Sequence, residues 1–505
     1  MKRILANYEK IIVYILVGFI VIQPFLDIRM LFTNPNLTIL GTTIPTIIRC
    51  LVIGVLCLLI LNDKRLPIRQ MLIYFGLVAI YFVIHHFITR NVTMPESYSY
   101  SLFGEIFYTI RLILPLLLIV ITRYSNLKYE QFRKMIIISS LIIGGVIVIS
   151  NSLYLSITSY MPSGAEADAT NTIAWYQWFN LPEVFDYPGA TSKGWFFMAN
   201  QISGVMSLLL LFNIYDLVKS PKILNILSSL LLIMAMLLIG TRVASYGWIV
   251  LIAAFVICML ICRFLSKTDH WQKKGVIWLG IIVVISSTLL FVSPIRNRNY
   301  DYDLGDGSDK VVSKLDDDAF VFDSLEEKEK FILDNYLEFK IQDTYIMDIY
   351  PYTYDPDFWI SYFKTSQTHV IQNREAQELI TSRIVESNSG VQYKLFGMSF
   401  SRFRNGGLYL ERDFVVQYYT IGIIGILLFL SPYIIFVLYK GITMLKDRKN
   451  NFTLFNCVVL LSVGFTLCAS VLSGHLYDEL IFTIYLGLII GFSLKKEKVD
   501  MIDNN

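Results

Sequence analysis

Five basic side chains stand in or beside long apolar segments of the sequence, where a charged group is costly to bury. They are Arg29, Arg49, Arg111, Lys193 and Arg242. An ionisable side chain at membrane depth is by default a functional candidate, because a partner or a ligand must offset its loss of water. Guanidinium groups fit phosphate oxygens, and the attraction strengthens where water is partly excluded. The pattern predicts a site for an anionic head group, such as the diphosphate of a lipid carrier.

A structural role is the alternative for some of these cations. Asp27 and Glu105 are acidic residues that could pair with Arg29 and Arg111, since a buried charge requires a partner. Arg242 has no acidic neighbour in the sequence. The functional interpretation is therefore strongest at Arg242.

The apolar segments that carry these side chains predict an all-α polytopic membrane protein with about twelve transmembrane helices. Hydrophobic residues make up 55% of the 505 residues and charged residues only 16%, which excludes an ordinary soluble enzyme. Each segment approaches the ~20 residues that a helix needs to cross a bilayer. The predicted spans are Ile11–Met30, Pro45–Leu61, Met71–Ile88, Gly104–Thr122, Met135–Leu155, Gly194–Tyr215, Ile223–Ile239, Val243–Cys262, Val276–Val292, Asp413–Tyr439, Phe452–Leu472 and Tyr477–Phe492.

Lys and Arg clusters alternate along the chain. Every second connection between predicted spans carries such a cluster, and the other connections carry few basic residues. By the positive-inside bias, this alternation predicts a multi-pass protein of the cell membrane with both termini in the cytoplasm and the longest loop outside. The expected division is transmembrane helices in 1–296, a large extracytoplasmic loop or cap in 297–411, further transmembrane helices in 412–494 and a cytoplasmic tail in 495–505.

The large loop has the composition of a small folded cap with two halves. Asp301–Asp357 is acidic, and Phe358–Arg404 is basic on balance. Within the second half, Thr368–Ser387 has the apolar periodicity of an amphipathic helix. The acidic run Asp301–Asp309 could suggest calcium, but it lacks the terminal Glu of a calcium loop. A solvated acidic surface is therefore favoured, and no metal site is expected.

Several short motifs follow one another in a defined order, and a large loop precedes the helix that contains Gly-x-x-Gly. They are Gly194-Trp-Phe-Phe-Met-Ala-Asn200-Gln, Ile239-Gly-Thr-Arg242, Lys394-Leu-Phe-Gly397-Met, Glu411-Arg-Asp413-Phe with Gly422-Ile-Ile-Gly425, and Ser473-Gly-His475. With these features, the chain from Lys193 onward resembles O-antigen ligase/polymerase-like membrane proteins, most closely the branch of Gram-positive bacteria. The resemblance implies a membrane-embedded glycosyltransferase that transfers or polymerises glycan units from undecaprenyl diphosphate at the outer face of the membrane, in cell-surface polysaccharide biosynthesis.

The resemblance also implies roles for individual residues. Arg242 matches the arginine of the family's Gly-Thr-Arg turn, and Arg374 best matches the loop-helix arginine that precedes the Phe-Gly motif. Both resemble diphosphate-binding groups. Arg49 and Arg111 are further candidates for this role, because each stands in the outer part of a predicted span.

Glu411 occupies the position at which many ligases of the family carry a histidine followed by asparagine. In the family that histidine activates the acceptor. Glu411 and Asp413 are therefore candidate catalytic residues that could accept a proton from a sugar hydroxyl, although a carboxylate titrates below a histidine unless its pKa is raised. The alternative is a helix start at the membrane interface, since acids are favourable in a first helical turn.

The implied reaction needs no cofactor and no metal. Its diphosphate is already a good leaving group, and cationic side chains can stabilise the charge that develops on it. The expected partners are a lipid-linked oligosaccharide donor, a glycan or lipid-linked acceptor and membrane lipid, with no nucleic acid. The sequence contains neither a Walker loop nor a Gly-x-Gly-x-x-Gly fingerprint. Polymerase and ligase are not separable, because both use the same donor.

Transport is the alternative function, as a polysaccharide or lipid flippase or another multi-span carrier. Carriers of this size often have two similar halves and charges near the membrane centre. The charges here lie toward the predicted outer boundary, which favours an outer-face enzyme. His85, His86 and His475 are expected to be interfacial residues that hold turns together, with a proton relay as the alternative.

Overall fold

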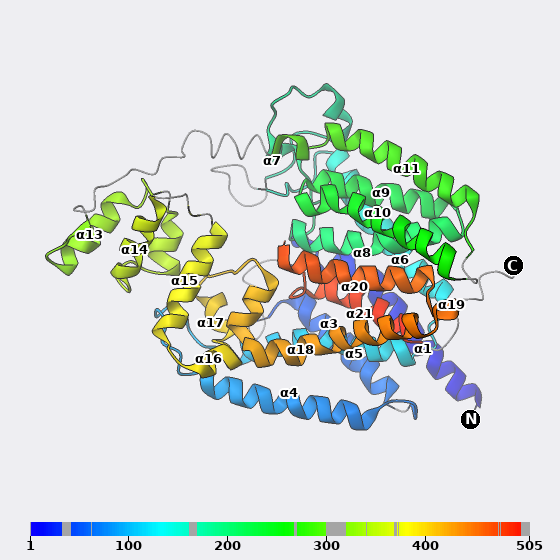
Figure 1. The fold of residues 1–505 in the computed structure, drawn as a ribbon, viewed down its shortest axis with the longest axis horizontal. Coiled ribbons are helices and arrows are strands. Elements are labelled where there is room, and N and C mark those ends of the chain that lie inside the picture. Colours follow the sequence, from blue (N-terminus) through cyan, green and yellow to red (C-terminus); the bar gives the residue numbers. More distant parts are fainter. Residues whose placement is uncertain are drawn as a thin grey trace. The chain divides into compact units, whose positions relative to one another are not determined.

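The computed structural model describes residues 2–32, 42–61, 63–160, 169–266, 270–298, 320–339, 341–367, 371, 373–472, 474 and 476–495. Within these ranges the protein is almost entirely helical, and the β pairing consists of two isolated bridges (Figure 1). The predicted all-α polytopic fold is confirmed. The acidic run Asp301–Asp309, His369 and His475 lie outside the described residues.

Nine of the described helices are long and apolar enough to cross a membrane, and three further apolar helices are shorter. Each of them overlaps one of the predicted ranges, and the exact number of spans stays a prediction. The helices are α1 (Lys2–Leu26), α3 (Ile44–Ile60), α4 (Ile68–Thr89), α5 (Leu102–Tyr124), α6 (Tyr129–Ser152), α8 (Ala199–Lys219), α9 (Ile223–Ile239), α10 (Arg242–Leu265), α11 (Lys273–Val292), α18 (Asp413–Lys446), α20 (Leu454–Leu472) and α21 (Leu480–Ser493).

Contacts divide the chain into two compact units. The first consists of Met1–Ile68, Ile110–Tyr300 and Leu430–Asn505, and the second consists of Arg69–Thr109 and Asp301–Phe429. The helices α5 and α18 each contribute residues to both units. The second unit therefore contains α4 and the first part of α18 in addition to the loop expected to form a cap.

The central helix of the first unit is α8. It packs against α6, α9, α10, α11, α20 and α21, and its residues from Gln201 to Val218 are all buried (Figure 1). Asn213 on α8 donates a hydrogen bond to Ser140 on α6 at 2.7 Å and accepts one from Ser228 on α9 at 2.6 Å. Polar contacts of this kind fix the register of helices that apolar packing alone leaves loosely specified in a bilayer.

The connection between α6 and α8 is a folded segment. Its residue Asn171 donates to the carbonyl of Asn151 at 3.1 Å. Near its end, the N–H of Ser192 donates to the carbonyl of Leu238 at 2.8 Å. The segment is thereby attached to the ends of both α6 and α9. It contains η1 (Trp175–Asn180) and α7 (Tyr187–Ala190).

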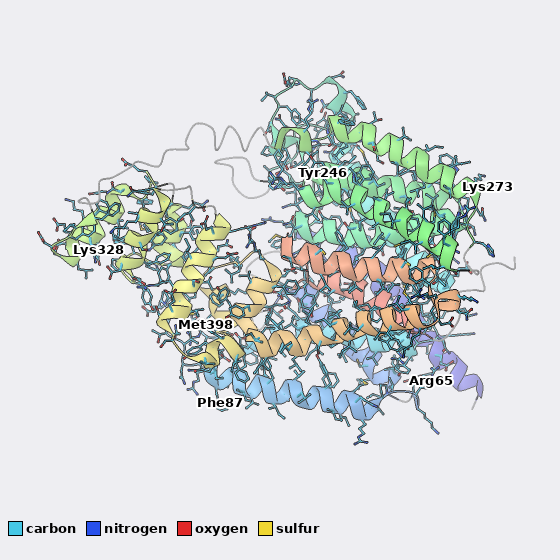
Figure 2. All side chains as sticks on the ribbon, in the orientation of Figure 1. Arg65, Phe87, Tyr246, Lys273, Lys328 and Met398 are labelled. Carbon is cyan, nitrogen blue, oxygen red and sulfur yellow. The ribbon has the colours of Figure 1, made fainter. Side chains whose placement is uncertain are left out.

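The cap lies in the second unit and has its own apolar core. Trp359, Phe363 and Ile380 are buried in it, and Val92 from the connection between α4 and α5 belongs to the same cluster. Lys328, labelled in Figure 2, forms an ion pair at 2.5 Å with Asp357. The expected amphipathic helix is observed as α15. The elements of the cap are α13 (Leu325–Asn335), η3 (Thr344–Ile349), α14 (Pro356–Ser366), α15 (Asn373–Ser387), α16 (Val391–Phe396) and α17 (Phe400–Asn405).

The long helix α18 is interrupted at Gly422, whose φ of 68° and ψ of −179° are not helical. The interruption leaves carbonyl groups of the preceding turn available to other donors. The N–H of Met398 donates to the carbonyl of Tyr419 at 2.7 Å, and the N–H of Ser399 donates to that of Thr420 at 3.2 Å. Met398 is labelled in Figure 2. The turn between α16 and α17 therefore satisfies the backbone groups that the break in α18 exposes.

Two glycines permit this close approach of backbones. Gly397 has a φ of 82°, and a Cβ at this position would lie 2.3 Å from the carbonyl oxygen of Thr420. A Cβ on Gly422 would lie 2.5 Å from the N atom of Gly397. Both the left-handed backbone and the absence of a side chain are required here. This explains why a Phe-Gly motif and a Gly-x-x-Gly motif occur together in the sequence.

Candidate functional site

Two ion pairs connect α15 to the start of α18. Nε of Arg374 donates to Oε2 of Glu411 at 2.5 Å, and Nη1 of Arg412 donates to Oε1 of Glu378 at 2.8 Å. The side chains of Arg374 and Glu411 are 39% and 33% exposed, so both remain accessible to a ligand. The structure thus brings together a predicted diphosphate-binding residue and a predicted catalytic residue.

Asp413, the second predicted catalytic carboxylate, is fully buried at the first position of α18. One turn later Gln417 is also buried, and its amide has no hydrogen-bond partner among the described residues. Of the two predicted catalytic residues, only Glu411 is partly exposed. A substrate hydroxyl could therefore reach Glu411 without a rearrangement, but not Asp413.

The charge of Glu411 acts on the hydroxyl of Tyr345, a residue of η3. Tyr345 of η3 accepts a hydrogen bond from Nε2 of Gln377 at 3.1 Å. Burial raises the pKa of Tyr345, and the charge of Glu411 raises it further, while the bond from Gln377 opposes both. Tyr345 is itself buried in the apolar core of the cap, so its phenol stays protonated.

Arg49, predicted to bind diphosphate, is buried in the first unit with only 3% of its surface exposed. Its Nε donates to Oε1 of Gln23 at 2.8 Å, and its guanidinium forms an ion pair with Asp27. Asp27 was expected as a partner for Arg29, and the structure places it on Arg49. The reason is geometric, because α1 and α3 pack together and bring side chains from two helices face to face.

Arg111 is held by the turn that precedes α21. Its Nη2 donates to the carbonyl of Asp478 at 2.7 Å and approaches Oε2 of Glu479 at 3.4 Å. Glu105, considered in the sequence as a structural partner for Arg111, is instead bonded to His85, Ser399 and Ser401. A structural role is thereby favoured for both Arg49 and Arg111.

Arg242 is the first residue of α10 and is exposed. The turn before it is fixed through the carbonyl oxygen of Gly240, which accepts hydrogen bonds from Tyr187 at 2.7 Å and from Nη1 of Arg298 at 3.3 Å. Arg298 also stacks on the ring of Tyr160, with 4.9 Å between its Cζ atom and the ring centroid. An exposed guanidinium on a rigidly held turn is well placed for an anionic ligand.

Backbone hydrogen bonds also fix the positions of Lys193 and Arg29, two other basic residues of the first unit. The N–H of Ser192 bonds to Leu238, and the neighbouring Lys193 is 9% exposed. The N–H of Arg29 donates to the carbonyl of Trp195 at 2.8 Å, and its guanidinium lies 5.7 Å from the ring of Phe197. The sequence analysis did not identify Arg298. Its one indication in the sequence is its position as a basic residue shortly after the ninth predicted span.

A buried polar network in the second unit was not predicted. His85 on α4 and Glu105 on α5 are 2% and 1% exposed, and Nε2 of His85 lies 3.1 Å from Oε2 of Glu105. The other carboxylate oxygen accepts the hydroxyl of Ser399 and, at 2.7 Å, the N–H of Ser401. Nδ1 of His85 is 2.6 Å from the carbonyl oxygen of Phe396. The network therefore binds the turn between α16 and α17 to both helices.

The hydrogen-bond partners determine how many protons the pair carries. A carbonyl can only accept, so Nδ1 of His85 must donate to Phe396. A further proton must then lie between Nε2 and the carboxylate of Glu105, because neither atom could otherwise donate. The pair is thus neutral as a whole, either as imidazolium and carboxylate or as imidazole and carboxylic acid. A neutral, fully bonded pair is the form that an apolar environment tolerates.

Arg402 of α17 holds the connection between α4 and α5 by its backbone. Its Nε donates to the carbonyl of Thr89 at 3.1 Å, its Nη2 to that of Arg90 at 2.8 Å and its Nη1 to that of Tyr98 at 2.9 Å. All of the oxygens that it contacts are carbonyls. The guanidinium fork therefore fixes the loop mainly through its backbone, and it also lies over the ring of Tyr100, 5.7 Å from the centroid.

The candidate residues belong to two different units. Glu411, Asp413 and Arg374 lie in the second unit, and Arg49, Arg111 and Arg242 lie in the first. Among the described residues, no group of three or more His, Cys, Asp or Glu side chains is arranged to hold a metal ion.

Comparison with known proteins identifies the family of the chain. A model of the family described as O-antigen ligase like membrane protein matches residues 8–497, nearly the whole chain. No curated protein matches the chain significantly. Because the family match covers far more than half of the sequence, the protein belongs to the O-antigen ligase-like membrane proteins.

Proposed function

We propose that the protein transfers or polymerises glycan units from an undecaprenyl-diphosphate-linked donor at the outer face of the membrane. Membership of the O-antigen ligase-like family supports membrane glycan ligation or polymerisation in general. The observation that supports the finer proposal is the contact between Arg374, proposed to bind phosphate, and the partly exposed carboxylate of Glu411, proposed as the base.

The proposed step is a displacement at the anomeric carbon of the donor sugar. The acceptor hydroxyl gives its proton to Glu411, its oxygen forms the new bond to the anomeric carbon, and the bond from that carbon to the diphosphate oxygen breaks. The carrier diphosphate leaves with the bonding electron pair. Arg374, which pairs with Glu411, is proposed to bind it and to stabilise its charge. Glu411 is proposed to supply the general base that the family histidine supplies elsewhere, and Arg242 is proposed separately as a diphosphate-binding residue of the first unit.

The topology that this reaction requires is part of the proposal. Both termini are proposed to lie in the cytoplasm, the cap formed by 297–411, which carries Arg374 and Glu411, outside, and the helices of 1–296 and 412–494 in the membrane. The alternation of basic clusters between the helices supports this orientation. The donor, acceptor and membrane lipid would meet at the same face.

The test uses the full-length protein purified into lipid vesicles together with authentic lipid-linked oligosaccharide. Release of the carrier diphosphate and the length of the glycan are followed for the wild type, Arg242→Ala and Arg374→Ala. Arg65→Ala is the matched control, because Arg65 is an exposed arginine paired with Asp63 in the connection between α3 and α4.

The outcomes separate the possible functions. Carrier release with longer glycans, lost in both test variants and kept in the control, identifies a polymerase. Release with transfer to a different acceptor identifies a ligase. If no transfer occurs and labelled donor crosses the bilayer instead, the proposal is wrong and the protein is a transporter.

A further inference from the structure

The break in α18 divides the helix into a short first part, 413–421, and a longer second part beyond Gly422. The first part starts directly after Glu411. Its orientation therefore sets where the carboxylate of Glu411 lies. Because a helix rises about 1.5 Å per residue, this part is ~12 Å long, and a tilt of about 10° at the break would displace its start by ~2 Å.

Side chains from α4 and α5 fix this break. The hydroxyl of Tyr81 on α4 donates to the carbonyl of Ile421 at 2.6 Å, at the last residue before the interruption. His85, one turn further along α4, bonds to the carbonyl of Phe396, and Glu105 on α5 holds Ser399 and Ser401. These bonds anchor the turn whose own N–H groups pair with the exposed carbonyls of α18.

The second end of the short part is held by different contacts. Arg374 and Glu378 of α15 pair with Glu411 and Arg412, which directly precede the helix. These ion pairs lie at the surface, and exposed ion pairs contribute little to stability. The buried network at the break is therefore the stiffer of the two supports.

We propose that His85 and Glu105 are a positioning pair for Glu411. They hold the turn between α16 and α17 against the break in α18 and thereby direct the first part of α18. Neither residue is part of the proposed chemical step. This inference rests on the proposed function, and a misplacement of reacting groups by about 1 Å can cost on the order of 10²-fold in rate.

Because the pair shares one titratable proton, a substitution at Glu105 can separate a positioning role from an acid–base role. In Glu105→Gln, the amide oxygen can accept from Ser399 and Ser401, and the amide N–H can donate to Nε2 of a neutral His85. This variant keeps every bond of the network and removes its acid. Glu105→Ala and His85→Ala remove the bonds themselves.

Steady-state transfer is measured for each variant in lipid vesicles with the lipid-linked oligosaccharide as donor. We expect kcat to fall at least tenfold in Glu105→Ala and His85→Ala, with the KM for the donor changed less than twofold. Glu105→Gln should retain kcat within about threefold, since it conserves the network. His86→Ala is the matched control, because His86 is adjacent on α4 and bonds to Tyr100 at 2.6 Å. It should behave as the wild type.

Three results would overturn the proposal. Full activity in both alanine variants would show that the network does not control the site. Loss of activity in Glu105→Gln would make Glu105 an acid or base rather than a positioning residue. A rise in KM at unchanged kcat would assign the pair to donor binding.

Hydrogen exchange of the amides in 413–421 tests the anchoring without any substrate. Exchange there should accelerate in Glu105→Ala relative to 430–446 and should be unchanged in Glu105→Gln. Unchanged exchange in Glu105→Ala would refute the positioning role. Because this experiment needs no glycan transfer, its outcome is independent of the proposed function. If the alanine variants do not fold, Tyr81→Phe removes a single hydroxyl at the break and should show the same exchange pattern more weakly.

Discussion

Arg374 and Glu411, which stand 37 residues apart in the sequence, meet at 2.5 Å on the surface of the cap. The adjacent pair, Glu378 with Arg412, has the opposite order of charges and joins the same two elements. This crossed arrangement offers a comparison between two carboxylates of similar exposure in almost the same place. Only one of them is proposed to act as a base.

Glu411→Gln should reduce kcat by on the order of 10²-fold or more, because a general base contributes roughly 10²–10⁴-fold. Glu378→Gln should stay within about threefold of the wild type, since an exposed ion pair adds little stability. Glu411→His should restore part of the activity, because histidine is a competent base near neutral pH. The measurement is carrier diphosphate release at saturating donor. Equal losses in Glu411→Gln and Glu378→Gln would reduce both residues to a structural role.

Arg49 and Asp27 form a buried ion pair, so removing either partner leaves a charge without its counterpart. Arg49→Ala should lower stability by about 3–5 kcal/mol, whereas replacing both residues by apolar ones should recover much of the loss. Thermal unfolding in detergent measures both effects. A normal unfolding temperature for Arg49→Ala with a raised KM for the donor would instead assign Arg49 to diphosphate binding.

Gly422→Ala should disrupt the break in α18, because the backbone has a φ of 68° and a Cβ would lie 2.5 Å from the backbone of Gly397. Gly441→Ala is the matched control in the same helix, since nothing lies within 4 Å of a Cβ there. The control should be neutral or stabilising by about 0.5–1 kcal/mol, which is the ordinary gain of alanine over glycine in a helix. Yield of folded protein and unfolding temperature distinguish the two. Equal behaviour would mean that the interruption is not required.

Asp355 gives the cap a defined response to acid. Burial raises the pKa of this carboxyl, but hydrogen bonds from Arg383, from the N–H of Phe358 and from Tyr350 outweigh it, so the pKa is lowered overall. A carboxyl whose pKa is lowered by folding stabilises the protein fully above its unfolded pKa of about 3.9, and this contribution is lost as the pH falls through the folded value. The cap should therefore loosen below about pH 4.

Protease susceptibility of α14, followed from about pH 6 to about pH 3, measures this loosening. Asp355→Asn should be less stable than the wild type at neutral pH and should lack the acid-dependent part. Asp357→Asn is the control, because the side chain of Asp357 is 73% exposed. An identical acid response in Asp355→Asn and the wild type would exclude Asp355 as its source.

The membrane helices could be predicted from the sequence because the bilayer imposes a strong and local rule. A segment that crosses hydrocarbon must bond its own backbone and must be apolar over most of its length. Each predicted range accordingly overlaps a helix in the structure. The interruption of α18 was not predicted, although Gly422 was recognised as part of a motif. A glycine permits a positive φ but does not require one, and the requirement comes from the backbone of Gly397.

The partners of the charged residues could not be read from the sequence. Asp27 stands two residues from Arg29 in the chain, yet it binds Arg49 on another helix. Glu105 bonds to serines nearly 300 residues away. Such pairings depend on how helices pack, and packing depends on side-chain shapes at long sequence separation. Arg374 and Glu411 were each recognised from motifs, but their contact was not foreseen.

The fork of Arg402 has an implication for how such proteins diversify. Because it donates to the carbonyl oxygens of Thr89, Arg90 and Tyr98, these three hydrogen bonds do not depend on the side chains at those positions. The side chains that pack are constrained all the same, since Val92 and Tyr98 are buried in the cap core and Tyr100 lies under the Arg402 guanidinium. Substitution of the exposed residues of this loop would therefore leave its backbone anchor at Arg402 in place.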